Sequence, residues 1–421
     1  MNARRIKAFL WPATAIISLY AILLAGCGPR QSGPGTAAIT LSGIPASRLY
    51  FRYEADVPAP QLPGETLPAD RDAGILADFQ TNRPADELVR TLASPDNRRI
   101  LAVYRREGDA AEEFRLDMYT KEGKLLRPVT PDNLAVHFQE IIRWAPDSSA
   151  VAFVATLREV AVSPTPVPLP SPAEEPSPNE TPAEETSPTP QSSPTPNLPP
   201  VMAFRTEQIY LCDSEAADLR PLTRNEGFIY YYFVWSPDST MLAAMATHSR
   251  EWQELERKAD EAGMLMTPLG RPRIIERTGR ERRLDDGLTS VRPVWSPDST
   301  KVATAFDTQI RIYDAAGDNP TQAAIPLRNE LLISSKAFDD AQAANLNAAN
   351  TGAAPDATPQ PTTLPDPNTL VSFNPIVQVA WTAPDVIYFE TAYIKQMKNA
   401  ADSVVSFARW HRLLLSPPPA S

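Results

Sequence analysis

Short apolar runs of five or six residues recur along the chain, and each lies beside a cluster of turn residues. One set lies at residues 100–104, 150–154, 241–245 and 302–306, and a second set lies at residues 114–119, 208–212 and 310–314. Runs of this length, bounded by polar turns, are typical of buried β-strands rather than of helices. The pattern therefore predicts an all-β protein in which one hairpin-rich unit is copied several times.

One phrase, Trp-x-Pro-Asp-Ser, marks the turn before the runs of the first set. Proline fixes the backbone at the first central position of a turn, and Asp and Ser hydrogen-bond nearby backbone groups, so the phrase predicts a tight reversal. Its recurrence indicates stacked copies of one four-stranded unit, in which these residues are structural. Three full copies and two variants are defined by Ala93, Pro95, Asp96, Trp144, Pro146, Asp147, Trp235, Pro237, Asp238, Trp295, Pro297, Asp298, Trp381, Pro384 and Asp385.

These motifs resemble those of TolB-type and WD-like β-propellers, whose blades carry Trp-Ser-Pro-Asp-Gly, then a strand, and then a hairpin that ends in Leu-Thr. The likeness covers roughly residues 37–415. Ser or Asn stands where that family has glycine after the aspartate. One extra residue separates Trp381 from Pro384, so we expect a β-bulge in the last copy.

The expected fold is a β-propeller of about six four-stranded blades, because about 300 residues remain outside the insertions and propeller repeats take roughly 40 to 50 residues each. Five copies are visible. The stretch around residues 48–53 would supply the sixth blade, closed by strands from residues 404–415. The propeller would be a single domain over residues 41–415, followed by a tail at residues 416–421.

The N-terminus resembles a bacterial lipoprotein signal. Three basic residues precede an apolar run from Ala8 to Ala25, and the run ends in Leu-Ala-Gly-Cys. This pattern implies a signal peptide at residues 1–26, a lipid on Cys27, and a tether at residues 27–40 that holds the protein outside the cytoplasm on a cell membrane. An uncleaved signal anchor, or a plain secretory signal, is the alternative. Pro12 and the short run argue against a stable spanning helix.

Two segments interrupt the repeat and are expected to be disordered. Residues 163–200 consist almost wholly of Pro, Ser, Thr, Glu, Asn and Gln, without aromatic or basic residues, and cannot bury enough apolar surface to fold. Residues 339–368 are rich in Ala, Asn, Asp, Pro and Thr. The first segment is either a tolerated insertion in an exposed loop or a docking strip or glycosylated arm.

A third insertion, residues 249–262, is expected to be a short amphipathic helix. Trp252, Leu255, Ala259 and Ala262 recur near the helical period, with charged residues between them. Such a helix packs on its own domain or binds a partner, for which Trp252 would be a suitable anchor.

Charge and cysteine content narrow the function classes. The formal net charge is −11, and loss of Arg4, Arg5 and Lys7 with a signal peptide lowers it to −14, so nucleic acid is a poor candidate partner. If Cys27 carries lipid, Cys212 is the only other thiol, which leaves no disulfide and no cysteine metal site. Cys212 stands in an apolar run and is expected to be a buried core thiol.

Catalytic and cofactor motifs are absent from the sequence. It contains no Gly-x-Ser-x-Gly, His-Glu-x-x-His, phosphate loop or Gly-x-Gly-x-x-Gly. His137, His248 and His411 are far apart and are expected to be structural or exposed rather than metal ligands. The repeated aspartates are better explained as turn acceptors than as calcium or catalytic carboxylates. We therefore expect no enzyme, no metal and no cofactor.

Three functional hypotheses follow. The first, implied by the resemblance, is a lipid-anchored propeller that binds or scaffolds a protein partner. The second is a small-molecule or glycan sensor with a site in the propeller channel. The third is a relative of the propeller-capped hydrolases similar to prolyl oligopeptidase, which is disfavoured because the sequence ends shortly after the last repeat.

Overall fold

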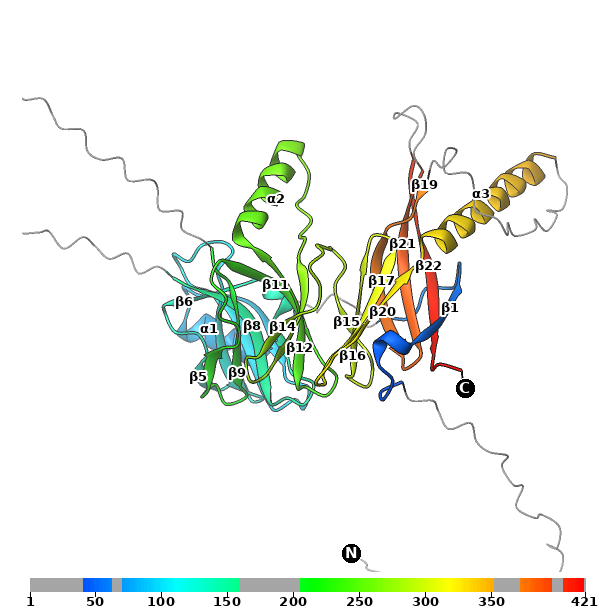
Figure 1. The fold of residues 1–421 in the computed structure, drawn as a ribbon. Coiled ribbons are helices and arrows are strands. Elements are labelled where there is room, and N and C mark those ends of the chain that lie inside the picture. Colours follow the sequence, from blue (N-terminus) through cyan, green and yellow to red (C-terminus); the bar gives the residue numbers. More distant parts are fainter. Residues whose placement is uncertain (1–40, 63–69, 159–204, 352–371, 396–403, 420–421) are drawn as a thin grey trace, which may run out of the picture. The chain divides into compact units, whose positions relative to one another are not determined.

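The computed structural model describes residues 41–62, 70–158, 205–351, 372–395 and 404–419, which consist mainly of antiparallel strands (Figure 1). The predicted signal peptide, tether, lipidated Cys27 and Pro-rich segment 163–200 lie outside these ranges. No helix within the described residues is long and apolar enough to cross a membrane.

The strands form five antiparallel sheets of four or five strands. The first contains β2 (Glu87–Ala93), β3 (Arg99–Arg105), β4 (Arg115–Thr120) and β5 (Leu125–Pro128). The second contains β6 (Leu134–His137), β7 (Arg143–Trp144), β8 (Ala150–Leu157), β9 (Gln208–Asp213) and β10 (Leu219–Pro221). The third contains β11 (Phe228–Trp235), β12 (Met241–His248), β13 (Arg271–Glu276) and β14 (Glu281–Arg283). The fourth contains β15 (Val294–Trp295), β16 (Lys301–Phe306), β17 (Gln309–Asp314) and β18 (Gln322–Pro326).

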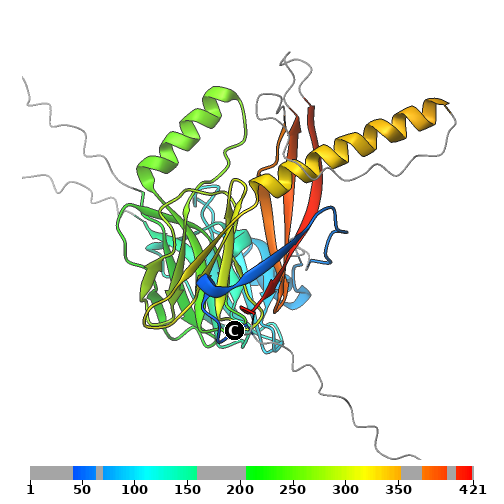
Figure 2. The same ribbon diagram turned by 45° about the vertical axis from the view of Figure 1, so that its right-hand side comes forward.

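The fifth sheet joins the two ends of the domain. It contains β19 (Ser372–Phe373), β20 (Ile376–Ala383), β21 (Val386–Lys395), β22 (Val404–Ser416) and, at its edge, β1 (Tyr50–Glu54). Figure 2 shows β1 in blue beside β22 in red, and Tyr53 is paired with Leu413. The predicted closure of residues 48–53 by a strand from residues 404–415 is confirmed, but the N-terminal stretch joins the fifth sheet and does not start a sixth blade. The described residues form five sheets where the sequence predicts about six, because a single strand cannot form a sheet and β1 completes the fifth one.

Each sheet packs on the next through a cluster of buried apolar side chains. Leu92 and Val151 belong to the cluster between the first and second sheets, and Ala303 and Phe389 belong to the one between the fourth and fifth. Two further clusters join the second sheet to the third and the third to the fourth. The described residues thus form an all-β fold of the propeller class, as the repeat predicts.

Three α-helices accompany the sheets. The first helix, α1 (Ala73–Asn82), was not predicted; it packs Ile75 and Phe79 on the first sheet, on the side away from the second. The predicted helix at residues 249–262 is confirmed as α2 (Ser249–Ala262). Two 3-10 turns, η1 (Ala46–Arg48) and η2 (Gln139–Ile141), complete the helical elements of the described ranges.

The third helix, α3 (Arg328–Thr351), corrects one prediction. The expected disordered loop at residues 339–368 is helical as far as Thr351, and the rest lies outside the described residues. Alanine, the strongest helix former, is frequent in this stretch and outweighs its Asn and Asp residues. Packing at the start of the helix adds to this, because Leu331 is buried among side chains of the fourth and fifth sheets.

The strand order gives each sheet two distinct ends. The turns with the Pro-Asp phrase, residues 94–98, 145–149, 236–240 and 296–300, define the repeat-turn end. Because neighbouring strands are antiparallel, the next connections emerge at the other end, which we call the insertion-bearing end: it carries the link from β8 to β9, α2 between β12 and β13, and α3 between β18 and β19. Both views show α2 and α3 at this end (Figures 1 and 2).

Candidate functional site

The repeated aspartates lie in the turns and are acceptors there. Asp238 Oδ1 accepts from the hydroxyl of Ser236 at 2.6 Å and from the backbone N–H of Thr240 at 3.1 Å. The next residue, Ser239, has a φ of 64°, a left-handed conformation that usually favours glycine. The position thus has the backbone conformation that the glycine of the propeller motif adopts freely.

The same turns also connect neighbouring sheets. The hydroxyls of the left-handed serines accept from the backbone N–H of the aspartate in the preceding turn, over distances of 2.9 to 3.0 Å. The pairs are Asp96 with Ser148, Asp147 with Ser239, and Asp238 with Ser299. The indole N–H groups of Trp144, Trp235 and Trp295 likewise donate to carbonyls of the preceding sheet, those of Leu92, Arg143 and Val234. The repeat residues thus hold the sheets together at this end.

The fifth copy departs from this arrangement. Trp381 is buried like Trp235 and Trp295, but its indole N–H has no acceptor among the described residues. The pairing of β20 with β21 shifts register between Trp381 and Ala383. This is the bulge that the extra residue before Pro384 predicts. Asp385 consequently stands in a tighter turn.

At the insertion-bearing end, α2 is fixed at its first turn. The Glu251 carboxylate accepts from the backbone N–H of His248 at 3.2 Å and from the Thr247 hydroxyl at 3.0 Å. Arg271 on β13 donates to both of its oxygens, at 2.8 and 2.9 Å. This bidentate contact lowers the pKa of Glu251 to about 2, so the carboxylate stays charged across the physiological range.

Trp252 docks α2 on the sheets. Its side chain is 6% exposed, and its ring lies 6.0 Å from that of Phe138 and 5.4 Å from that of Tyr231. Its indole N–H donates to Glu256 at 2.6 Å. The helix therefore packs on its own domain, and Trp252 is already used for that contact.

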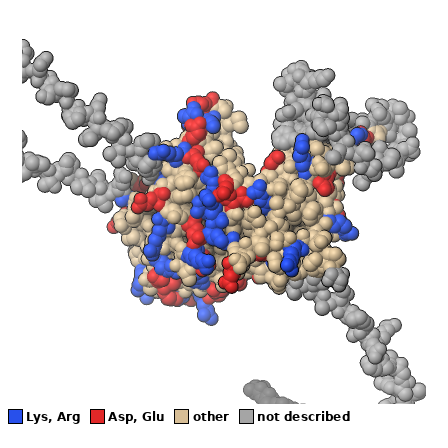
Figure 3. Space-filling model, in the orientation of Figure 1, with Lys and Arg blue, Asp and Glu red and all other residues tan. Residues whose placement is uncertain are grey.

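The far end of α2 presents apolar side chains to solvent. Gly263 ends the helix in a left-handed conformation, and the two residues that follow, Met264 and Leu265, are 70% and 95% exposed. The helix surface behind them is charged, and Figure 3 shows Lys and Arg beside Asp and Glu over this region. Arg257, for example, forms ion pairs with Glu254 and Glu261. Two adjacent apolar side chains of this exposure, in an ordered turn beside a charged helix, are typical of a contact surface.

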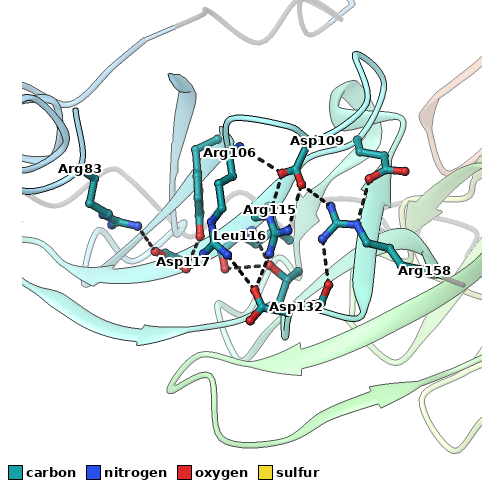
Figure 4. A network of polar contacts seen from close by, with 11 residues as sticks. Arg83, Arg106, Asp109, Arg115, Leu116, Asp117, Asp132 and Arg158 are labelled. Carbon is teal, nitrogen blue, oxygen red and sulfur yellow. Dashed lines mark hydrogen bonds and ion pairs between the residues drawn. The ribbon is translucent and has the colours of Figure 1, made fainter. Parts of the chain in front are cut away.

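An ion network with Arg115 and Asp109 buried at its centre includes Arg158, the last described residue before the segment 159–204 (Figure 4). Arg115 donates to both oxygens of Asp109, at 2.8 and 2.9 Å, and to Asp132 at 2.8 Å. Arg158 lies next to the segment and pairs with Glu113 at 2.9 Å and with Asp109 at 3.2 Å. The bond from Arg115 keeps the pKa of Asp109 below its usual range. The strand that enters the segment is thus fixed to the first sheet.

On the other side of the segment, Arg205 pairs with Glu207, which is fully buried. Burial raises the pKa of Glu207 to about 7, against the attraction of Arg205. Nearby His137 is buried as well, and burial together with the charge of Arg205 lowers its pKa. Arg205, Glu207 and His137 thus form a group of polar side chains at the insertion-bearing end, which was not predicted from the sequence.

The remaining candidate side chains are structural. The His411 ring is buried between the Tyr53 hydroxyl at 2.9 Å and the Thr391 hydroxyl at 3.1 Å, so it has no access to a substrate. The His248 ring lies beside that of Phe228, with ring centres 4.1 Å apart and the planes tilted by 41°. Cys212 is buried, and burial raises the pKa of its thiol to about 12. Within the described residues, no three His, Cys, Asp or Glu side chains are grouped to hold a metal ion.

Comparisons with known proteins give distant likenesses. No protein-family model and no curated protein matches the chain. An oligogalacturonate lyase in complex with manganese is similar over 78% of this chain and 65% of that chain, at 12% identity and a TM-score of 0.35. Another, from Vibrio parahaemolyticus, is similar over 86% and 73%, at 10% identity and a TM-score of 0.36. The structure of putative TolB from Agrobacterium tumefaciens is similar over 79% and 90%, at 12% identity and a TM-score of 0.27.

The chain spans 65% of the first lyase and 34% of a prolyl endopeptidase that is also similar to it. Likenesses at this level carry no argument about activity, so the fold class rests on the sheets themselves.

Proposed function

We propose that this protein is a non-catalytic β-propeller, lipid-anchored outside the cytoplasm through Cys27, that holds a protein partner at its insertion-bearing end. The observation that carries the proposal is the contrast between the two ends. Near-identical turns hold the sheets together at one end, while α2, α3 and the strand ends that flank residues 159–204 lie at the other. Binding residues are concentrated in such variable connections on a rigid scaffold.

The exposed turn after α2 is the proposed contact element. Trp252 and Glu251 fix the helix on the domain, so little conformational entropy is lost when its end binds a partner. Met264 and Leu265 would then fill an apolar pocket of that partner, surrounded by the charged side chains of the helix.

Two experiments test these parts separately. The first is a pull-down from membranes that carry the protein, analysed by mass spectrometry. It should recover a partner protein that the Leu265→Glu variant no longer retains. Equal recovery of that partner by both forms would contradict the role of α2. The Cys27→Ser variant should leave the membrane fraction and migrate at a changed processed size. If it still fractionates with membranes at the same size, the anchor is not a lipid on Cys27.

A further inference from the structure

A cavity of about 390 Å³ lies between β10, an edge strand of the second sheet, and β14, an edge strand of the third. One wall is the end of β10 with the residues after it, including Arg220 and Arg224, and the other is the β13–β14 hairpin, including Arg273 and Arg283. Among the described residues that line it, the only carboxylate is that of Glu281. Four positive charges and one negative charge thus line this cavity, in a chain whose net charge is −11.

The carboxylate of the lining is already used within the protein. Glu281 forms an ion pair with Arg273, and it accepts from the Tyr230 hydroxyl at 2.8 Å and from the Asn225 amide at 2.7 Å. The side chains of the ion pair are largely buried, at 13% and 9% exposure. The Arg273 guanidinium also lies over the Phe228 ring, 4.7 Å from its centre. This pair therefore balances one of the four arginines and leaves three without a carboxylate in the lining.

One of those three, Arg224, has no partner within the described residues. It is exposed and forms no hydrogen bond or ion pair with any of them. Arg220 pairs with Asp218 at 3.4 Å, and Arg283 pairs with Asp286 at 2.6 Å, but neither aspartate lines the cavity. The two aspartates are 67% and 82% exposed, and ion pairs at such exposure contribute little. The positive charge of the cavity is thus not balanced within it.

The two walls of the cavity are held against each other by the backbone. Arg220 donates to the carbonyl of Arg277 at 2.8 Å, which joins β10 to the β13–β14 hairpin. Gly279, in the turn of that hairpin, has a φ of 89°, and a Cβ there would lie only 3.1 Å from the carbonyl oxygen of Leu222. The hairpin turn thus packs directly on the second sheet, and the arginines of both walls are already in place for a ligand.

Like charges also lie opposite one another on the hairpin. Arg273 on β13 is paired in register with Arg283 on β14, and side chains paired in this way share one face of the sheet. Glu281 forms its ion pair with Arg273 and none with Arg283. Like charges directly opposite one another are destabilising, so a bound anion would relieve this repulsion.

We propose that this cavity is an anion-binding site that takes a small molecule with more than one phosphate or carboxylate group. A guanidinium presents its donors in a planar fork that matches either oxyanion, and the volume fits a small organic ion. The apolar part of the lining is confined to Pro221 and Leu222, which favours a compact polar ligand over a flat apolar one. No residue of this lining belongs to α2, so the site is independent of the proposed partner contact there.

The test uses calorimetric titration of the purified protein, in about 0.1 M salt, with pyrophosphate, with citrate, and with glycerol as a neutral control. At least one of the two anions should bind saturably, and glycerol should not. Arg224→Gln should weaken that binding by about tenfold or more, because it removes a charged donor from the site. The matched control is Arg280→Gln on the same hairpin. The Arg280 side chain is 76% exposed and does not line the cavity, so this variant should bind within about twofold of the original protein.

The pattern of the two anions identifies the chemistry. Binding of pyrophosphate alone points to a phosphorylated ligand, binding of citrate alone to a polycarboxylate, and binding of both to a site for either oxyanion. Failure of both to bind overturns the proposal. Binding by Arg224→Gln that is no weaker than binding by Arg280→Gln also overturns it, because the charge of the whole surface would then account for the affinity.

A melting measurement separates a binding role of Arg224 from a structural one. Since Arg224 has no partner within the described residues, Arg224→Gln should melt at the same temperature as the original protein in buffer without either anion. The anion that binds should then raise the melting temperature of the original protein more than that of the variant. A melting temperature lower by several degrees without anion would show that Arg224 supports the fold, and would overturn the proposal.

Discussion

The backbone N–H of Asp147 donates to the hydroxyl of Ser239 over 3.0 Å, although the residues lie 92 positions apart in the chain. The acceptor stands at a φ of 64° because the turn needs a left-handed residue there. The contact recurs between the neighbouring pairs of sheets. Serine at the glycine position of the motif therefore forms a hydrogen bond between sheets, which glycine, without a side chain, could not form.

We expect Ser239→Ala to lower the free energy of unfolding by about 1 to 3 kcal/mol, since it leaves the Asp147 N–H without its acceptor and keeps a Cβ at positive φ. Ser239→Gly should cost less, because glycine adopts this conformation freely. Urea unfolding of both variants, beside the exposed Ser290→Ala, measures the difference. Equal stability of all three would mean that the hydroxyl does not join the sheets.

The tryptophans offer an internally controlled comparison. Trp295→Phe should cost about 1 kcal/mol more than Trp381→Phe, because only the Trp295 indole donates to a carbonyl, that of Val234 at 3.1 Å. The two side chains are similarly buried, at 7% and 8% exposure, so the loss of ring area is matched. Denaturant unfolding of the pair decides; a larger loss at Trp381 would contradict the assignment of the hydrogen bond.

Acid should weaken the fifth sheet through His411. Burial lowers the pKa of this residue from 6.5 to about 4, so between those values the unfolded chain binds more protons than the folded one. Its contribution is complete above pH 6.5 and falls by up to about 3 kcal/mol as the pH drops to 4. Unfolding measured from pH 4 to 7.5 should show a shallower decline for His411→Gln than for the original protein.

The contribution of Glu207 to stability changes with pH in the opposite direction to that of His411, so it needs its own control. Burial raises its pKa from 4.5 to about 7, so its contribution is complete below pH 4.5 and is lost as the pH rises through 7. Glu207→Gln should therefore remove the loss of stability that develops between pH 4.5 and 7. The control compares Glu207→Gln with the double variant that also carries His411→Gln. If stability falls equally steeply with decreasing pH in both, His411 is not the acid-sensitive group.

The segment 159–204 should be dispensable for folding. Ala155 on β8 pairs with Gln208 on β9, so the strand ends on either side of the segment are close enough for a short turn. Joining Arg158 to Arg205 by a Gly-Ser turn keeps the ion pairs with Glu113 and Glu207 and should leave the melting temperature within a few degrees. A drop of ten degrees or more, or loss of a cooperative transition, would show that the segment packs on the sheets.

The repeat could be predicted from the sequence because its signals are local. Pro146 and Asp147 specify a turn by themselves, and the apolar run after them specifies a strand. The helix that begins at Ser249 likewise shows its own period. The meeting of residues 48–53 with residues 404–415 was predicted, and the pairing of Tyr53 with Leu413 confirms it. The blade count was not predicted, because nothing local in the sequence shows that these stretches belong to one sheet with β20 and β21.

The candidate sites depend on such distant contacts even more strongly. Nothing around Arg224 in the sequence marks it as part of a cavity wall, since that follows from the packing of the β13–β14 hairpin against the second sheet. The ion network of Arg115 with Asp109 and Asp132 is similarly assembled by the fold. For α3, the composition contains two opposing signals. Its many alanines favour a helix, whereas its Asn and Asp residues favour a loop, and the helix forms.

Site-specific photo-crosslinking in intact membranes tests the central claim most directly. One crosslinker replaces Leu265, in the exposed turn after α2, and the control replaces Asp318, which is exposed in the hairpin at the repeat-turn end of the fourth sheet. The account predicts a discrete protein adduct from position 265 and none of the same mass from position 318. An adduct from position 318 alone, or the same adduct from both positions, would contradict partner binding at the insertion-bearing end.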